Sequence, residues 1–343
     1  MRNVLFIAPR YMNLYLDVIK EMENQGYSVD FIPEESFKED PYNVRGYIRY
    51  GKIWVNKEKF VRKNRCRWKK ILALEQYDKS YDILFVLDGQ SLDSYLFDEL
   101  KRRNPQIKTI NYLFDTTTGV YRFDKFFSFF DRVVSFDPVE VDKYSLEYMP
   151  IYWIPSISDD KYKYDVFGLG AMSLQRFDLF SVIKQICLDN KFSFYLKLLP
   201  NFKVNSWVCY RIRCFIRQLI GLGNTNIPID ALKSDFIIHE GLSPEIFRKF
   251  IANSNIIIDT SAPHQDGLTA RFMWALGAGK KIVTTNLKVV NTTFYNEKQI
   301  FLYSEDVKRT DIVSFMEVPY TGSSDNIDLL QARIDNWTSF MLK

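Results

Sequence analysis

The sequence predicts an α/β fold with parallel sheets, divided into two domains. Short apolar runs rich in β-branched and aromatic residues alternate with longer stretches at helical spacing, which is typical of strand-helix-strand units. The chain has 343 residues, so two domains of roughly 150 residues each are expected. A composition of 47% hydrophobic and 26% charged residues excludes a disordered, collagen-like or coiled-coil protein.

The first predicted domain covers residues 1–155. Buried apolar runs predict its strands, which are 3–8, 28–33, 83–87, 109–114 and 133–136. Helical spacing predicts helices over 12–24, 60–76 and 91–103, and Gly26 ends the first of them.

The second predicted domain covers residues 156–322, and its first residues belong to a polar linker without periodicity at 155–164. Its predicted strands are 165–169, 193–198, 236–239, 256–259 and 281–284, and its predicted helices are 176–189, 207–220, 244–252 and 267–276. We therefore expect two Rossmann-like domains that face each other across a cleft. Residues 323–343 form a C-terminal segment, helical in spacing over 327–342, that is predicted to pack back on the first domain.

Positive charge is concentrated in one segment of the chain. Nine Lys or Arg and one acid lie between Lys52 and Lys70, so this segment contributes +8 to a net charge of +4. Trp54, Phe60 and Trp68 are interleaved with these charges, a combination that suits an anionic membrane surface or a polyphosphate ligand. The alternative is a solvated helix face. Nucleic acid is disfavoured as a partner, because the rest of the chain is acidic and shows no recognition motif.

Four residues of this segment are our candidates for a membrane or acceptor surface: Arg62, Lys63, Arg65 and Arg67. The predicted helix 207–220, with Arg211, Arg213 and Arg217, is a second candidate for such a surface. No run approaches the roughly 18 apolar residues of a membrane span. We expect a cytoplasmic protein, with peripheral attachment to the inner face of the plasma membrane as an option.

The cysteines and histidines give no pattern for a metal site. The four cysteines have no Cys-x-x-Cys spacing, and His239 and His264 are the two histidines. We expect reduced thiols, no structural zinc and no metal cofactor.

The most informative stretch is residues 256–286. A buried strand ends in a polar loop, and a helix opens at Gly267-Leu-Thr269. Backbone N–H groups and partial positive charge at a helix start favour a diphosphate in the loop from His264 to Thr269, and Arg271 adds a charged donor. An ordinary strand-helix crossover with a surface Arg is the alternative.

This stretch resembles the donor-binding half of GT-B glycosyltransferases, particularly bacterial lipopolysaccharide-core and capsule enzymes grouped with CgeB-like proteins. The matching residues are Asp259, Pro263, Gln265, Gly267, Leu268, Thr269, Arg271, Gly277, Gly279, Lys280, Lys281, Thr284, Thr285 and Asn286. Weaker matches lie upstream, at Tyr112-Leu-Phe-Asp115, at Phe130–Pro138 and at Asp165–Gly168 with Arg176. Trp274 departs from the pattern, because relatives often have a Glu there that contacts the donor ribose.

The resemblance implies transfer of a sugar from a nucleotide-sugar to a glycan or lipid-linked acceptor in surface polysaccharide (lipopolysaccharide, O-antigen or capsule) synthesis. Helix N-termini and Arg side chains would neutralise the diphosphate without a metal, and the sequence has no Asp-x-Asp motif. The implied donor-binding residues are Gly168, Gly170, Arg176, His239, Glu240, His264, Gln265, Asp266, Gly267, Leu268, Thr269 and Arg271.

Inversion at the anomeric carbon is favoured over retention. The commonest retaining GT-B enzymes have two Glu eight residues apart, and the equivalent positions here are His264 and Phe272. Inversion needs a carboxylate that takes the proton of the acceptor hydroxyl. Asp115, at a predicted strand end, is our first candidate, followed by Asp88 and Asp137, although each is also explained as a cap or turn carboxylate.

Two other functions are consistent with the fold class. A non-catalytic carbohydrate- or nucleotide-binding protein would keep the same architecture. An NAD-dependent oxidoreductase or epimerase ranks lower, because the first strand is followed by Pro9-Arg-Tyr11 without any glycine. The second possible fingerprint, Gly168-Leu-Gly170-Ala-Met-Ser173, lacks its third glycine.

Overall fold

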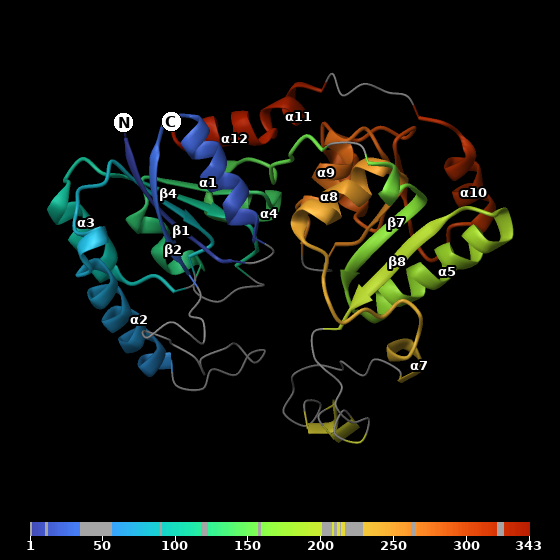
Figure 1. The fold of residues 1–343 in the computed structure, drawn as a ribbon, viewed down its shortest axis with the longest axis horizontal. Coiled ribbons are helices and arrows are strands. Elements are labelled where there is room, and N and C mark those ends of the chain that lie inside the picture. The colour runs from blue at the N-terminus through green and yellow to red at the C-terminus, as the bar shows by residue number, and fades with distance from the viewer. Residues whose placement is uncertain are drawn as a thin grey trace. The chain divides into compact units, whose positions relative to one another are not determined.

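A computed structural model gives the fold of the chain (Figure 1). It describes residues 2–10, 13–34, 57–89, 91–117, 123–156, 159–200, 229–261, 265–320 and 326–343, together with 208, 211–212 and 214–216. The chain divides into two compact units, each with its own sheet. The first unit contains Met1–Tyr152, Ala262–Leu268 and Gln331–Lys343, and the second contains Trp153–Ser261 and Thr269–Leu330.

The sheet of the first unit has six parallel strands in the order β2-β1-β3-β4-β5-β6. The strands are β1 (Asn3–Ala8), β2 (Ser28–Pro33), β3 (Ile83–Leu87), β4 (Lys108–Leu113), β5 (Arg132–Ser135) and β6 (Glu147–Tyr148). Strands β1 and β3 are buried along almost their whole length, which explains their continuous apolar sequences. The bounds of β1, β2 and β3 agree with the sequence prediction.

Helices cover this sheet on both faces, as the right-handed crossovers between parallel strands require. They are α1 (Leu14–Asn24), α2 (Lys57–Leu72), α3 (Ser94–Arg103), α4 (Pro138–Tyr144) and α12 (Ile334–Met341), with short 3-10 helices at Glu75–Tyr77 and Phe123–Phe129. Helix α2 packs on α3 through Trp68, which is fully buried and donates its indole N–H to Ser91 O at 2.9 Å.

The C-terminal helix α12 packs on the first unit, as predicted. Trp337 is fully buried and forms an edge-to-face contact with Tyr112, at 4.9 Å between ring centroids. Gln25 at the end of α1 donates to Asp335 O at 2.8 Å. The predicted continuous helix over 327–342 is two helices, because α11 ends at Gln331 and α12 begins after an extended Arg333.

The sheet of the second unit has five parallel strands in the order β11-β10-β9-β7-β8. The strands are β7 (Tyr164–Ala171), β8 (Phe194–Leu199), β9 (Ser254–Asp259), β10 (Lys281–Thr284) and β11 (Ile300–Leu302). The predicted strand 236–239 is wrong: a single bridge joins Ile237 to Leu198, and the chain turns away before His239.

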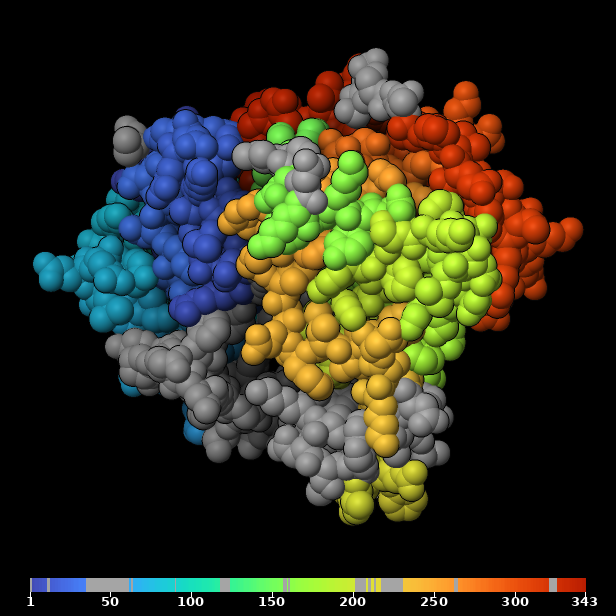
Figure 2. Space-filling model, turned by 45° about the vertical axis from the view of Figure 1, so that its right-hand side comes forward, coloured from blue at the N-terminus to red at the C-terminus, as the bar shows by residue number. Residues whose placement is uncertain are grey.

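The helices of the second unit are α5 (Leu174–Asn190), α7 (Ile229–Leu232), α8 (Pro244–Asn253), α9 (Ala270–Gly277), α10 (Arg309–Glu317) and α11 (Ile327–Gln331), which ends at the boundary between the units; η4 (Asp160–Tyr162) and η5 (Leu287–Asn291) are 3-10 turns. In Figure 2, α5 (yellow-green) and α10 (red) reach the same face of this unit. Of the predicted helix 207–220, residues 208, 211–212 and 214–216 are helical and the rest lies outside the described residues. No helix in the described part of the chain has both the length and the apolarity needed to cross a bilayer.

Candidate functional site

Acidic residues gather at the carboxyl edge of the first sheet, where parallel α/β sheets bind their ligands. Glu34 follows β2, Asp88 follows β3, Asp115 follows β4 and Asp137 follows β5. Three of these four were candidates from the sequence. Glu34 was not, although it shares with them the one sequence signal, an acid within two residues of the end of a predicted strand.

Asp137 acts as a structural anchor. It is 1% exposed, and its Oδ1 accepts the N–H of Val139 at 2.9 Å, which caps α4. Its Oδ2 accepts the N–H groups of Asp266 and Gly267, both at 2.9 Å. Gly267 has no room for a side chain, because a Cβ would lie 2.6 Å from the Phe136 ring. The carboxylate is therefore saturated by backbone donors, which argues against a role as the proton-accepting base.

The same contacts change the interpretation of the predicted phosphate loop. The N–H groups of Asp266 and Gly267, which we expected to face a diphosphate, are bound to Asp137 inside the first unit. Leu268 is buried and Gln265 is half-buried. His264 lies outside the described residues.

Asp88 lies in a tightly fixed turn after β3. It adopts a left-handed conformation with φ of 66°, which Asp tolerates better than most residues. Its N–H donates to Tyr112 O at 2.8 Å, and its C=O accepts from Asn111 Nδ2 at 2.9 Å. Its Oδ1 accepts the N–H of Phe114 at 2.8 Å. Burial raises the pKa of Asp88 well above its usual range, and the negative charge of Glu34 adds to this shift.

Asp115 is half-buried and lies two residues beyond the end of β4. Its Oδ1 accepts the N–H of Thr116 at 2.8 Å, a local turn contact that leaves the side chain at the sheet edge. Its charge also acts on Asp88 and raises the pKa of that carboxyl. The structure therefore brings Asp88 and Asp115 into one electrostatic cluster.

Arg176 is fixed at the carboxyl edge of the second sheet. Its Nε donates to Thr260 Oγ1 at 2.5 Å, and its NH1 donates to Ala171 O at 2.7 Å. Both acceptors are neutral oxygens, and they fix the position of the guanidinium. The side chain lies over Gly170, where a Cβ would be 3.3 Å from Arg176 Cδ. Ser173 caps α5 by accepting the N–H of Arg176 at 3.2 Å.

Gly168 serves packing in the core. A Cβ there would lie 2.8 Å from the Phe180 ring and 2.9 Å from Leu196. Strand β7 continues to Ala171, so Gly168 and Gly170 both lie inside a strand. Packing in the core therefore explains Gly168 without the donor contact that the resemblance implies.

Asp259 and Arg271 form a buried pair at the end of β9. Asp259 is 1% exposed, and its carboxylate accepts from Thr269 Oγ1 at 2.6 Å and from Thr284 Oγ1 at 3.1 Å. Arg271 NH1 lies 3.8 Å from Asp259 Oδ1 and donates to Ile258 O at 3.2 Å. The Arg271 side chain is 12% exposed. Its NH1 is thus turned toward β9, and its role as a diphosphate ligand stays a prediction.

The remaining positions singled out in the sequence are the predicted donor-binding residues His239 and Glu240 and the departure from the pattern at Trp274. His239 and Glu240 are exposed and precede α8, which Ser243 caps by accepting the N–H of Ile246 at 3.3 Å. Trp274 is buried on α9, where Phe247 contacts it edge-to-face at 5.7 Å. The position where relatives often have a ribose-binding Glu is thus part of the core here.

The candidate membrane surface is only partly exposed. Arg62 and Arg65 are exposed on α2, and the side chain of Lys63 lies outside the described residues. Arg67 is 2% exposed and donates from NH2 to Pro33 O at 2.6 Å. Arg67 therefore supports the end of β2, and its assignment to a membrane surface is wrong.

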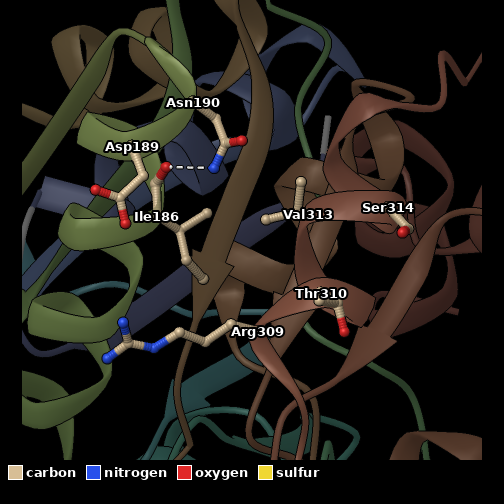
Figure 3. Close-up of a pocket in the computed structure, with 7 residues that line it drawn as sticks. All are labelled: Ile186, Asp189, Asn190, Arg309, Thr310, Val313 and Ser314. Carbon is tan, nitrogen blue, oxygen red and sulfur yellow. Dashed lines mark hydrogen bonds between the residues drawn. The ribbon is translucent and has the colours of Figure 1, made fainter.

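A pocket of about 350 Å³ lies elsewhere in the second unit, between α5 and α10 (Figure 3). Its lining residues are Ile186, Asp189, Asn190, Arg309, Thr310, Val313 and Ser314. Asn190 is anchored by donating to Ile186 O at 2.9 Å. Because Arg176 and this pocket lie at opposite ends of α5, about 20 Å apart along the helix, the pocket is separate from the carboxyl edge.

The sequence matches no family model and no curated protein. Solved structures nevertheless share its fold over nearly the whole length. AviGT4, a glycosyltransferase involved in avilamycin A biosynthesis, has 10% identity and a TM-score of 0.56, covering 100% of this chain and 96% of that chain. A UDP-forming α,α-trehalose-phosphate synthase from Burkholderia xenovorans has 11% identity and a TM-score of 0.54, covering 100% and 98%.

UDP-GlcNAc 2-epimerase from Methanocaldococcus jannaschii has 12% identity and a TM-score of 0.51, covering 100% of this chain and 99% of that chain. These likenesses show that the chain has the α/β fold of GT-B proteins, with two Rossmann-like domains. At such low identity they establish the fold alone.

Proposed function

We propose that this chain is a glycosyltransferase that moves a sugar from a nucleotide-sugar donor to a hydroxyl group of a glycan or lipid-linked acceptor. The observation that supports this most is the contrast between the two sheet edges. The second unit fixes the Arg176 guanidinium on neutral acceptors, whereas the first unit places Asp88 and Asp115 together. Fixed positive charge suits a diphosphate, and a strand-end carboxylate suits removal of a hydroxyl proton.

In this proposal the carboxyl edge of the second sheet, where Arg176 lies, binds the donor diphosphate. The guanidinium is held by Thr260 and Ala171, so it is oriented before the ligand arrives and can donate charge-assisted hydrogen bonds without reorganisation. Gly170 keeps the surface beneath the guanidinium free of a side chain. We propose that the leaving diphosphate is stabilised by this charge and not by a metal.

The acceptor class and the stereochemistry are part of the proposal. Resemblance of the 259–286 motif to lipopolysaccharide and capsule enzymes supports a role in surface polysaccharide synthesis. His264 and Phe272 in place of the two Glu of retaining enzymes support inversion. An anionic membrane surface remains a proposed partner through the exposed Arg62 and Arg65.

The experiment is a donor screen with the purified chain. Release of nucleoside diphosphate and formation of glycosylated product are measured for UDP-, GDP-, CDP- and dTDP-sugars, with and without glycan acceptors. We expect one donor to give acceptor-dependent release. Conversion of a nucleotide-sugar to its epimer without an acceptor would instead support an epimerase, a function found on the same fold.

Arg176→Ala and Arg309→Ala form a matched pair for this screen. Both remove one arginine from the second unit, but Arg309 lies at the other end of α5, in the pocket of Figure 3. We expect loss of transfer only in Arg176→Ala. Equal activity in the two variants would contradict the assignment of the donor edge.

A further inference from the structure

Four large apolar side chains are exposed on one short helical stretch of the second unit. They are Val208 at 67%, Ile212 at 54%, Phe215 at 62% and Ile216 at 49% exposed. The described residues of this stretch, 208, 211–212 and 214–216, are helical. In a helix of about 3.6 residues per turn, residues three, four, seven and eight positions apart share one side. The four side chains therefore form one apolar surface, the 208–216 face.

The opposite side of this stretch is packed in the protein. Cys214 is 8% exposed and belongs to the hydrophobic core of the second unit, together with Ala231, Leu232 and Phe236. Residues two positions apart on a helix point about 200° apart, so Cys214 points away from its neighbours on the 208–216 face. The packing of Cys214 thus directs the 208–216 face to the outside of the unit, where Figure 2 shows the segment in yellow.

The sequence around the 208–216 face is positively charged. Between Asp189 and Asp230 the chain has six Lys or Arg and no acid. One of the six, Arg211, is exposed beside Ile212. An apolar face with basic neighbours is typical of helices that lie in the interface of an anionic bilayer. Contact with a second copy of the chain would instead bring two positive stretches together, which like-charge repulsion opposes.

Helix α2 has the positive charge without such a face. Arg62 and Arg65 are exposed on it. The large apolar side chains described on this helix, which are Trp68, Ile71 and Leu72, are all buried. Charge alone gives an attraction that salt screens, whereas apolar side chains in the acyl region add attachment that salt does not screen. The described part of α2 therefore lacks the apolar anchor that the 208–216 face supplies.

We propose that the 208–216 face inserts into the interface of an anionic lipid bilayer. Val208, Ile212, Phe215 and Ile216 enter the boundary of the acyl chains, and Arg211 binds lipid phosphates. This membrane surface stands independently of the proposed chemistry. Together with the proposed glycosyl transfer, on which this last step rests, it selects a lipid-linked acceptor over a soluble glycan, because protein and acceptor then share one surface.

The test is sedimentation of the full chain with vesicles of phosphatidylcholine, with and without phosphatidylglycerol. We expect binding to the mixed vesicles that weakens when NaCl is added, and about tenfold weaker binding to phosphatidylcholine alone. The double variant Ile212→Ser with Phe215→Ser should lower partitioning onto the mixed vesicles by about tenfold or more, because it removes apolar area that only the bilayer covers.

The matched control is Leu188→Ser with Val318→Ser. These two apolar side chains of the second unit are 55% and 63% exposed and lie outside the 208–216 face. The control should bind the mixed vesicles as the wild type does. Equal binding by the two double variants would overturn the proposal, and so would a wild type that binds neither kind of vesicle.

Two further measurements separate the alternatives. Sedimentation velocity without vesicles tests for a second copy: a wild-type dimer that Ile212→Ser with Phe215→Ser dissociates, without vesicle binding, would assign the 208–216 face to self-association and overturn the membrane surface. Vesicle binding without turnover of any donor would support the membrane surface while refuting the proposed transfer. Transfer to soluble acceptors by a chain that binds no vesicle would do the reverse.

Discussion

The carboxyl edges of the two sheets have the same architecture and opposite chemistry. In the first sheet, β2, β3, β4 and β5 are each followed within two residues by an acid. In the second sheet, the acid at the end of β9, Asp259, is buried against Arg271, whereas Arg176 is held by neutral acceptors. Equal topology thus produces one edge suited to accept a proton and one suited to bind an anion.

Acids at the edge of the first sheet also differ in what surrounds them. Asp88 follows β3 and Asp137 follows β5, with β4 between them at one sheet edge. Asp137 is saturated by three backbone N–H groups, whereas Asp88 lies beside other acids. We therefore expect the hydrogen-bond donors around a strand-end carboxylate, and not its position alone, to decide whether it has a structural or a chemical role.

The largest expected effect is on turnover. Asp88→Asn keeps the acceptor for Phe114 N–H and tolerates the left-handed φ, but cannot take a proton. We expect kcat to fall by about 100-fold or more, with donor affinity unchanged, when the carboxylate that takes the acceptor proton is lost, either in this variant or in Asp115→Asn. Steady-state kinetics of both variants measure this. Wild-type turnover in both would place the base elsewhere.

Removal of the Asp137 carboxylate should lower the stability of the fold more than removal of any other acid at the carboxyl edge of the first sheet. Asp137→Ala leaves the N–H groups of Val139, Asp266 and Gly267 without their carboxylate, which we expect to lower the free energy of unfolding by about 3 kcal/mol. Asp142→Ala, an exposed acid on the same helix α4, is the control. Similar denaturant midpoints for the two variants would contradict the structural role of Asp137.

Removal of Arg271 tests its pairing with Asp259 at the carboxyl edge of the second sheet. Arg271→Ala leaves Asp259 with its two threonine donors but without the positive charge, and we expect a loss of about 2 kcal/mol in unfolding free energy. Nucleotide affinity should fall less than in Arg176→Ala. A variant of wild-type stability that no longer binds nucleotide would restore Arg271 as a diphosphate ligand.

The smallest effect concerns the pH dependence of stability. The pKa of Asp88 is raised in the folded state, so the folded protein binds this proton more tightly than the unfolded chain. The contribution of Asp88 to the free energy of unfolding is full below its pKa in the unfolded chain, near 4. It is lost as the pH rises toward its pKa in the folded protein. We expect Asp88→Asn to lose less stability than the wild type between pH 4 and 8. Equal slopes in urea titrations would contradict the shift.

Buried strands were the features that the sequence defined best. The bounds of β1, β3 and β10 follow from continuous apolar runs between polar residues. The run 236–239 is equally apolar but forms one bridge, because strand formation also depends on a partner that the local sequence does not specify. Likewise the helical spacing of 327–342 continues through the break before α12.

Long-range contacts explain what the sequence could not show of the site. Asp137 binds Gly267 across 130 residues, and Glu34 binds Ser91 across 57, so neither partnership leaves a local pattern. Arg67 has the sequence context of a surface charge, yet folding places it under the end of β2. The strand-end acids Asp88 and Asp115 were predictable because their position depends only on the strands that precede them.

Calorimetric titration of the full chain with nucleoside diphosphates tests the central claim, that the two edges divide anion binding from proton transfer. We predict that at least one of UDP, GDP, CDP and dTDP binds the wild type and that its Kd rises about tenfold or more in Arg176→Ala, the loss expected for a charged hydrogen bond. Asp88→Asn and Arg309→Ala should bind it with wild-type affinity. Equal affinity in Arg176→Ala, or loss of binding in Asp88→Asn, would contradict the account.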